Sequence, residues 1–347
     1  MQIFSVQTLQ LKRGKATWLW KVFLAVLASL ALLITVAEFV ARSPLSARLP
    51  APSVGSGNFL FDTKIYQLES QVRLKGGVDC LFVGSSATDT GVDPAVVERV
   101  YEQRTGKKIR CYNAGISQMT GHNSVEFSKA LVNRYHPDVI FYIILLRDIH
   151  RDEDNVDFIE QSRWLQSNLS QPTLADWPVN NSYAYRYYLT WRYWLTAENR
   201  AYMFTPLKDL TAQGFHPKIG SSAKAPAVTR PGLESINAED LTINALAGFL
   251  EIKSQGTQVI LIEAPQYTDP SIDVTNDPYW LAYNNLFIPM LTRTSAEYSL
   301  PFWHTAELSI LIPDSLWHDR FHLNSVGAVT FSEWIGSQMA QNITLLK

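Results

Sequence analysis

A serine, an aspartate and a histidine stand in two short segments that lie far apart in the 347-residue chain. Ser86 follows an apolar run and a glycine, and Asp319 and His322 are three residues apart near the C-terminus. A serine hydroxyl is a weak nucleophile unless an adjacent base takes its proton, and a histidine base needs a carboxylate to hold its tautomer. These residue types indicate acyl chemistry, with Ser86 as nucleophile, His322 as base and then acid, and Asp319 orienting the imidazole.

Each of these segments also has a purely structural interpretation. Gly-Ser-Ser at 84–86 occurs in ordinary turns, where small residues are favoured. Asp319 suits a capping position, and His322 suits a buried core. His318 lacks the three-residue spacing to an aspartate and is interpreted as a surface or loop histidine.

The surrounding residues predict an alternation of strands and helices. Apolar runs favour buried strands over 79–83, 109–113, 139–146, 258–264 and 302–305. Caps and periodicity favour helices over 93–105, 123–135, 239–254, 278–299 with an interruption at Pro289, and 325–341. This alternation predicts a parallel sheet covered on both faces, with a ligand site beyond the carboxyl ends of its strands. Ser86 and the turns at Asn113 and Arg147 all follow expected strand ends.

The N-terminal part of the chain predicts a membrane anchor. Residues 22–41 are mostly apolar and about one bilayer thickness long, and Trp18 and Trp20 stand at their start. Basic residues are in excess before this run, which places residues 1–21 in the cytoplasm and the rest of the chain across the membrane. A cleaved signal peptide and the buried helix of a soluble protein are the two alternatives.

The remaining organisation follows from composition. Residues 42–58 are rich in Pro, Ser and Ala and predict a linker to a domain over 59–347. Apolar residues make up 46% of the chain, and the net charge of -2 predicts no strong electrostatic attraction to nucleic acid or anionic lipid. Cys80 and Cys111 lie in strand-like runs and are interpreted as buried thiols, although a bridge would form if their strands were neighbours. Neither metal-site spacing nor a glycine-rich phosphate loop occurs, so no cofactor is expected.

One stretch, 150–238, does not fit the alternation and predicts an insertion. It is rich in aromatic residues, and one helical face carries Ala184, Tyr187, Tyr188, Trp191, Trp194 and Leu195. This face is expected to pack on the main domain. The alternatives are an aromatic wall for a glycan or acyl chain and a membrane-facing surface. Residues 205–238 predict a loop.

Four short blocks resemble the SGNH (GDSL-type) hydrolase superfamily. The resemblance covers about residues 78–148 and 257–340, and the block Asp319-x-x-His322 matches without departure. It is closest in character to the membrane-anchored branch that includes alginate O-acetylation proteins and the D-alanyl transfer protein of teichoic acid synthesis. The resemblance implies a three-layer αβα, flavodoxin-like parallel sheet and a site that needs neither metal nor nucleotide.

The other three blocks depart from the family pattern. Gly-Asp-Ser is here Gly-Ser-Ser, so Ser85 replaces the aspartate before the nucleophile. Asn-x-x-Ile-Ser-Gly is here 113–118, which puts an oxyanion-hole N–H on Gln118 beside that of Ser86. Gly-x-Asn-Asp is here 145–148, where Arg147 replaces the asparagine as oxyanion donor. Other site neighbours implied by these blocks are Asn113, Gly115 and Asp148, the last with a structural turn role as its alternative.

The sequence therefore predicts a single-pass, extracytoplasmic serine esterase or O-acyltransferase that forms an acyl-enzyme on Ser86. Topology and resemblance favour cell-envelope or exported polysaccharide as substrate, and a membrane-bound acyl-transfer partner. The alternative is a catalytically inactive SGNH-like module that binds glycan or scaffolds an envelope complex. The altered second and third blocks and the aromatic insertion motivate that alternative.

Overall fold

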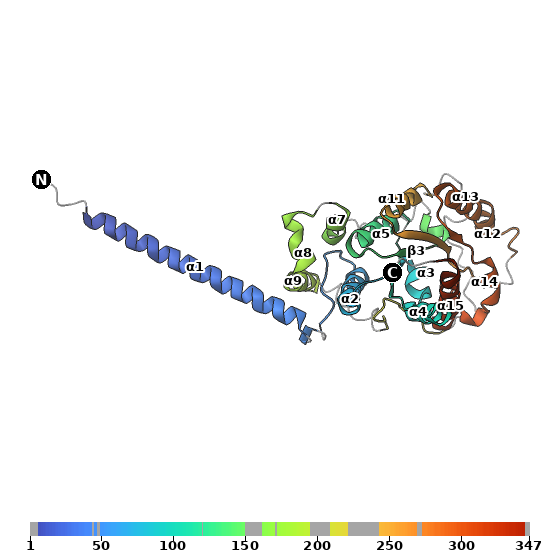
Figure 1. The fold of residues 1–347 in the computed structure, drawn as a ribbon, viewed down its shortest axis with the longest axis horizontal. Coiled ribbons are helices and arrows are strands. Elements are labelled where there is room, and N and C mark those ends of the chain that lie inside the picture. Colours follow the sequence, from blue (N-terminus) through green and yellow to red (C-terminus); the bar gives the residue numbers. More distant parts are fainter. Residues whose placement is uncertain are drawn as a thin grey trace.

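The structure, a computed structural model, begins with one long helix, α1 (Val6–Arg42), which extends away from the rest of the chain (Figure 1). It describes residues 6–43, 45–46, 49–119, 121–149, 162–170, 172–194, 209–220, 243–268 and 273–343. The predictions for 150–161, 195–208, 221–242 and the other intervening residues lie outside this described part.

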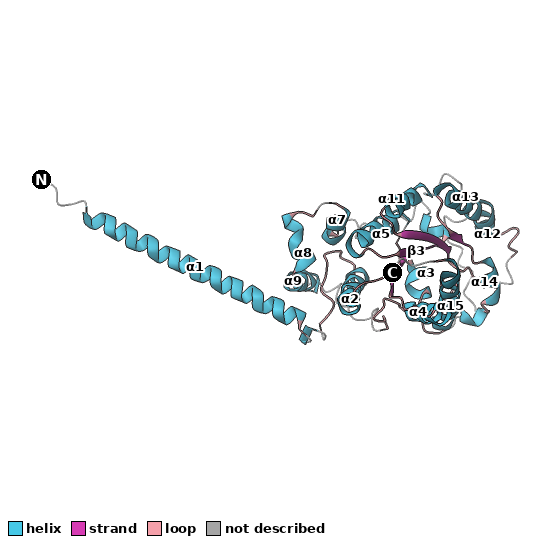
Figure 2. Ribbon diagram, in the orientation of Figure 1, coloured by secondary structure: helices cyan, strands magenta, loops and turns pink. Residues whose placement is uncertain are grey.

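The domain is built on five parallel strands. They are β1 (Cys80–Gly84), β2 (Cys111–Asn113), β3 (Val139–Ile144), β4 (Gln258–Glu263) and β5 (Phe302–Trp303). Their order across the sheet is β2-β1-β3-β4-β5, and every neighbouring pair is parallel. This is the flavodoxin-like order, in which the chain turns back between β1 and β3. The predicted parallel α/β sheet is confirmed, and Figure 2 shows helices surrounding it.

Helices cover both faces of the sheet. The α-helices of the domain, within the described residues, are α2 (Phe59–Lys75), α3 (Ser86–Gly91), α4 (Pro94–Thr105), α5 (Gly121–Tyr135), α7 (Arg163–Leu169), α8 (Trp177–Asn181), α9 (Tyr183–Trp194), α11 (Gly248–Ser254), α12 (Pro278–Ala282), α13 (Ile288–Tyr298), α14 (Ala306–Leu311) and α15 (Ser325–Asn342). Short 3₁₀ segments are η2 (Leu146–Ile149), η4 (Leu174–Asp176), η6 (Ile243–Ala247) and η8 (Asp314–Leu316).

Two separate cores confirm the three-layer arrangement. Alternate residues of a strand point to opposite faces, so Leu81 joins one core and Phe82 the other. The first core packs the sheet against α2, α5 and α11, and the second packs it against α4 and α15. Both faces of the central strands are therefore dry, which explains why β3 is apolar along its whole length.

The predicted helix over 278–299 is interrupted earlier than expected. A π-helical segment, η7 (Tyr283–Phe287), separates α12 from α13. Pro289 lies in the first turn of α13, directly after the π segment, and proline has no N–H to donate to a carbonyl of that segment. The α-helical pattern is therefore interrupted just before the proline, by the π segment.

The two cysteines form a disulfide, so the interpretation as free thiols is wrong. Cys80 and Cys111 are register partners on the neighbouring strands β1 and β2, with 4.6 Å between their Cα atoms. This spacing lies within the range that a disulfide spans. The condition stated for a bridge, that the two cysteines lie on neighbouring strands, is therefore met by β1 and β2.

The prediction that the aromatic face of α9 packs on the domain is wrong for Tyr188 and Trp191, whereas Ala184 and Tyr187 on that face are half-buried. Tyr188 and Trp191 are exposed, while Arg186 and Thr190 on the other side are buried. Burial of an arginine is tolerated because the Arg186 guanidinium pairs with Glu69 of α2, with 3.0 Å between Nη2 and Oε1. Leu195 and the side chain of Trp194 lie outside the described part.

Helix α1 contains the expected apolar segment. Residues Thr17–Arg42 have a mean hydropathy of 2.4 over their most apolar window, and none of that window is buried. A core helix of a soluble protein would be covered, so that alternative is wrong, whereas a membrane span and a signal sequence both fit. After α1 the chain packs back on the domain, since Val54 is buried and the N–H of Ser53 donates to Thr190 Oγ1 over 2.8 Å.

Candidate active site

Ser86, His322 and Asp319 meet at the carboxyl edge of the sheet. The Ser86 Oγ lies 2.8 Å from His322 Nε2. The other ring nitrogen, Nδ1, lies 2.8 Å from both carboxylate oxygens of Asp319. The hydroxyl, the imidazole and the carboxylate thus form one hydrogen-bonded chain, which is the arrangement of a nucleophile, a base and a group that orients the base.

The position of Ser86 follows from the sharp turn between β1 and α3. Gly84 has a φ of 147°, a backbone conformation that residues other than glycine rarely adopt. A Cβ at this position would overlap the carbonyl oxygen of Ile143 on β3 and the hydroxyl of Thr88. Glycine therefore lets the strand end close against β3 while Ser86 begins the helix, half-buried at the surface of the site.

A compact turn before α15 holds the other two residues. Asp319 Oδ1 accepts hydrogen bonds from the N–H groups of Phe321 and His322 over 2.8 and 3.0 Å. An antiparallel bridge between Trp317 and Leu323 closes the turn. Burial raises the pKa of the Asp319 carboxyl, but the bond to His322 and the two backbone donors outweigh it and bring the pKa to about 2. Asp319 is therefore an anion at neutral pH.

The turn after β2 packs against the helix that carries Ser86. The Asn113 amide donates to the carbonyls of Thr88 and Val92 over 2.7 Å each, so its role is to hold α3. Gly115 lies so close to α3 that a Cβ would fall 2.5 Å from the backbone nitrogen of Asp89. Both predicted site neighbours thus act on the position of α3.

Gln118 occupies the position at which the family pattern has glycine. It has a φ of 69° in a turn closed by the bond from Met119 N–H to the Ile116 carbonyl, 3.1 Å long. A positive φ at the third residue of a turn explains why glycine is favoured there. The N–H of Ile116 donates to the Gly84 carbonyl over 2.9 Å, which places the turn beside the Ser86 segment.

Ser85 and Asp148 form a second contact beneath the site. The fully buried Ser85 hydroxyl donates to Asp148 Oδ2 over 2.9 Å, and the same oxygen accepts the N–H of Leu145 over 3.1 Å. Asp148 therefore ties the end of β3 to the end of β1, in agreement with its structural interpretation. Because Ser85 is buried and engaged, it is not available to an incoming ester.

Arg147 lies half-buried in η2, next to this contact. Its charge acts on the Tyr279 phenol, as does that of Arg320, whose guanidinium lies 5.4 Å from the Tyr279 ring centre. Burial raises the pKa of Tyr279, and these two cations offset the shift only in part. His318 lies in the triad turn, where its N–H donates to the His322 carbonyl over 2.8 Å.

A buried ion pair beside the triad was not predicted from the sequence. Lys64 Nζ lies 2.6 Å from Asp89 Oδ1 and also donates to the Gly115 carbonyl over 2.6 Å. His216 Nδ1 lies 3.4 Å from the other oxygen of Asp89. The only sequence signal was the position of Asp89, one helical turn after Ser86. Within the described ranges, no group of three or more histidines, cysteines or carboxylates is arranged to hold a metal ion.

No protein-family profile and no curated protein matches the chain. Several solved structures resemble the chain at low identity, and three of them are described here. The lipase/acylhydrolase from Enterococcus faecalis is 14% identical and covers 78% of this chain and 100% of its own, with a TM-score of 0.36. The acetylxylan esterase Axe2 from Geobacillus stearothermophilus, in a catalytic mutant, is 15% identical and covers 78% and 98%, with a TM-score of 0.40. The psychrotrophic esterase EstA from Pseudoalteromonas sp. is 11% identical and covers 76% and 99%, with a TM-score of 0.39. The chain is similar to these three proteins.

Proposed function

We propose that this chain is a membrane-anchored serine hydrolase of the SGNH type, an esterase or O-acyltransferase that works outside the cytoplasm. The observation that carries the proposal is the unbroken chain of hydrogen bonds from Ser86 through His322 to Asp319. A cap or a buried core histidine would not require a serine hydroxyl 2.8 Å from the free ring nitrogen. Nucleophilic catalysis requires that contact.

The first half of the reaction acylates Ser86. Its Oγ attacks the carbonyl carbon of an ester while His322 Nε2 takes the hydroxyl proton. The Asp319 carboxylate, an anion at neutral pH, holds Nδ1–H and stabilises the imidazolium that forms. The tetrahedral intermediate collapses, the ester C–O bond breaks, and the leaving alcohol receives the proton from Nε2.

The charge on the intermediate needs donors at the developing oxyanion. The N–H of Ser86 serves this role because the first N–H groups of a helix have no partner within the helix. The N–H of Gln118 is the second donor, on the turn that the Ile116–Gly84 bond holds beside β1. Arg147, next to Asp148 in the sequence, is the third candidate, since a guanidinium stabilises the same charge as an asparagine amide.

The second half returns the enzyme to its resting state. His322 takes a proton from an acceptor hydroxyl, which attacks the acyl-enzyme, and Nε2 then protonates Ser86 Oγ as the acyl bond breaks. Water as acceptor gives an esterase, and a sugar hydroxyl gives an O-acyltransferase. Residues of an envelope or exported polysaccharide are the proposed acceptors, because the anchor holds the domain at a membrane surface.

Two observations support a location across the membrane from residues 1–21. The apolar run Thr17–Arg42 is long enough to span a bilayer, and the basic residues precede it. The disulfide between Cys80 and Cys111 persists in oxidising compartments such as the periplasm or the cell exterior. A reporter fused to the C-terminus should be active only outside the cytoplasm, and activity inside the cell would overturn this orientation.

Ester hydrolysis by the purified full-length chain tests the reaction. The wild type should hydrolyse p-nitrophenyl acetate, and the Ser86→Ala and His322→Ala variants should lose this activity. Adding a soluble oligosaccharide and following acylated sugar by mass spectrometry separates the transferase from the esterase. A folded wild type that hydrolyses nothing and transfers nothing would favour the inactive glycan-binding or scaffold module.

A further inference from the structure

Helix α9 is fixed to the body of the domain through its inner face. Arg186 is only 1% exposed, and its guanidinium pairs with Glu69 of α2 and donates from Nε to the carbonyl of Val179. Ion pairs buried in this way have a defined geometry, because an unpaired charge there would be costly. The direction in which the opposite face of α9 points is therefore fixed as well.

That opposite face presents large aromatic side chains to solvent. Tyr188 and Trp191 are 59% and 62% exposed, and Trp177 on the preceding helix α8 is 58% exposed. We call Trp177, Tyr188 and Trp191 the aromatic patch. Exposed groups of large apolar side chains mark a contact with a partner or a membrane. Tyr and Trp favour the membrane interface, where one end of the ring is apolar and the other is wet.

The end of the anchor helix α1 is clamped to the start of α9. The Glu38 carboxylate accepts hydrogen bonds from the N–H groups of Tyr183 and Ala184, each 3.0 Å long. Arg42 donates to the carbonyl of Asn181 over 2.6 Å, and its guanidinium lies 4.6 Å from the Tyr183 ring centre. Figure 1 shows α7, α8 and α9 at the end of the domain nearest α1.

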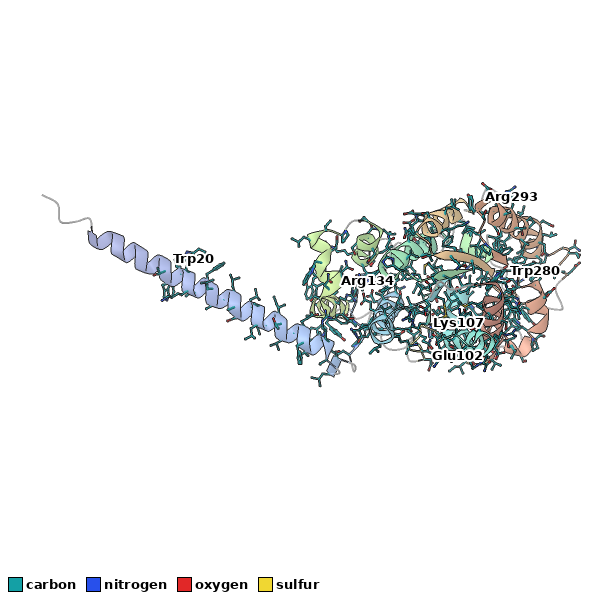
Figure 3. All side chains as sticks on the ribbon, viewed as in Figure 1. Trp20, Glu102, Lys107, Arg134, Trp280 and Arg293 are labelled. Carbon is teal, nitrogen blue, oxygen red and sulfur yellow. A yellow bond between two sulfur atoms is a disulfide. The ribbon has the colours of Figure 1, made fainter. Side chains whose placement is uncertain are left out.

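The length of α1 places this clamp at a membrane surface. Trp20 lies on the part of α1 that is distant from the domain (Figure 3) and is 63% exposed. From Trp20 to Glu38 an α-helix rises about 27 Å, which is close to the roughly 30 Å of the hydrocarbon core. With Trp20 at one interface, Glu38 and the start of α9 therefore reach the other. Arg192, exposed on α9, adds a cation for lipid phosphates, and α9 contains no acidic residue.

We propose that the aromatic patch lies in the headgroup region of the membrane that holds α1. The occupant of this surface is lipid, because the clamp and the length of α1 bring it to the interface of that bilayer. The proposal rests on the anchor in the proposed function. Its consequence is a domain held in one orientation by two contacts, so the active site stays at a set height above the membrane.

Fluorescence of the full-length chain in nanodiscs tests this contact. The Trp191→Cys variant is labelled with an environment-sensitive NBD dye, which does not react with the disulfide cysteines. In nanodiscs of unlabelled lipid, the emission of the dye should shift to the blue. In nanodiscs whose lipids carry a nitroxide at the headgroup, the emission should lose most of its intensity. Leu281→Cys, an exposed apolar position on α12 at the other end of the domain, is the matched control and should show neither change.

A third label separates failure of this proposal from failure of the anchor. Leu32→Cys lies on the exposed apolar part of α1 and should be quenched by nitroxides deep in the acyl chains. Quenching at position 32 without quenching at position 191 would overturn the lipid contact, leave the anchor intact, and assign the patch to a protein partner. Absence of quenching at both positions would overturn both proposals. Equal quenching at 191 and 281 would also contradict the oriented contact. Ester hydrolysis by each labelled variant reports that the domain is folded.

Discussion

Lys64 and Asp89 form an ion pair in which both side chains are 1% exposed, with 2.6 Å between Nζ and Oδ1. Asp89 lies on the short helix that begins at Ser86, and Lys64 also binds the carbonyl of Gly115. The pair therefore joins α2 to the nucleophile helix and to the turn that leads to Gln118. Burial raises the pKa of Asp89, but the Lys64 charge and the hydrogen bond with His216 outweigh it and keep the pKa below its usual value.

Removing the lysine from this pair should destabilise the domain strongly. The Lys64→Met variant leaves Asp89 as an unpaired buried carboxylate, which costs about 3–5 kcal/mol. Chemical unfolding of the full-length chain in detergent, followed by tryptophan fluorescence, measures the loss.

An exposed ion pair provides the matched control. Arg99 and Glu333 lie 3.3 Å apart with about half of each side chain exposed, and such pairs contribute roughly 0–1 kcal/mol. Arg99→Met should therefore unfold nearly as the wild type does. Similar losses of unfolding free energy for the two variants would contradict the prediction that the buried Lys64–Asp89 pair is the more costly to break.

Gly115→Ala should lower activity through the position of α3. The new Cβ would fall 2.5 Å from the backbone nitrogen of Asp89, so the helix must move and carry Ser86 with it. Because a misplacement of about 1 Å can cost about 10²-fold in rate, we expect a large loss in kcat for ester hydrolysis. Gly91→Ala, on the same helix, meets its nearest neighbour at 3.9 Å and should keep nearly full activity. Equal rates for the two variants would contradict the close packing of Gly115.

Asp319→Asn should impair catalysis and change stability in acid. Without the carboxylate the imidazole loses its tautomer partner, so kcat should fall on the order of 10³–10⁴-fold. The folded pKa of Asp319, about 2, lies below its ordinary value of 3.8. Its contribution to stability is therefore complete above about pH 4 and is lost as the pH falls toward 2. Unfolding curves from pH 5 to pH 2 should drop less steeply for this variant than for the wild type. Asp314→Asn, an exposed carboxylate in η8, controls for the loss of one charge.

Removal of the disulfide should destabilise the sheet edge formed by β1 and β2. The bridge closes a loop between positions 31 residues apart, for which chain entropy gives about 3–4 kcal/mol. The Cys80→Ala/Cys111→Ala variant should melt at a lower temperature than the wild type. A reductant should lower the melting temperature of the wild type but not that of the variant. Two alkylated cysteines in the untreated native protein would show that the bridge is absent.

The sequence predicted those features that local patterns define. A glycine and a serine after an apolar run indicated the end of β1, and Asp-x-x-His indicated the turn at 319–322, so Ser86, Asp319 and His322 could be assembled at one edge of a parallel sheet. The alternation of strands with helices gave the three layers. Each of these signals is contained in a few consecutive residues, the range over which hydrophobic periodicity and turn chemistry can be recognised.

The features that were missed depend on residues distant in sequence. No local pattern indicates that Arg186 is buried, because its partner Glu69 stands 117 positions earlier. The disulfide required the register of β1 with β2, and Lys64 carries no local sign of its pairing with Asp89. Interactions of this kind are set by tertiary packing, which overrides helical periodicity.

Covalent labelling by a fluorophosphonate, followed by mass spectrometry of the labelled peptide, tests the central claim most directly. The account predicts one adduct on Ser86 of the full-length wild type, its loss in Ser86→Ala and His322→Ala, and its retention in Ser85→Ala, because Ser85 is buried against Asp148. An adduct on any other residue, or no adduct on a folded wild type, would contradict the assignment of Ser86 as the nucleophile.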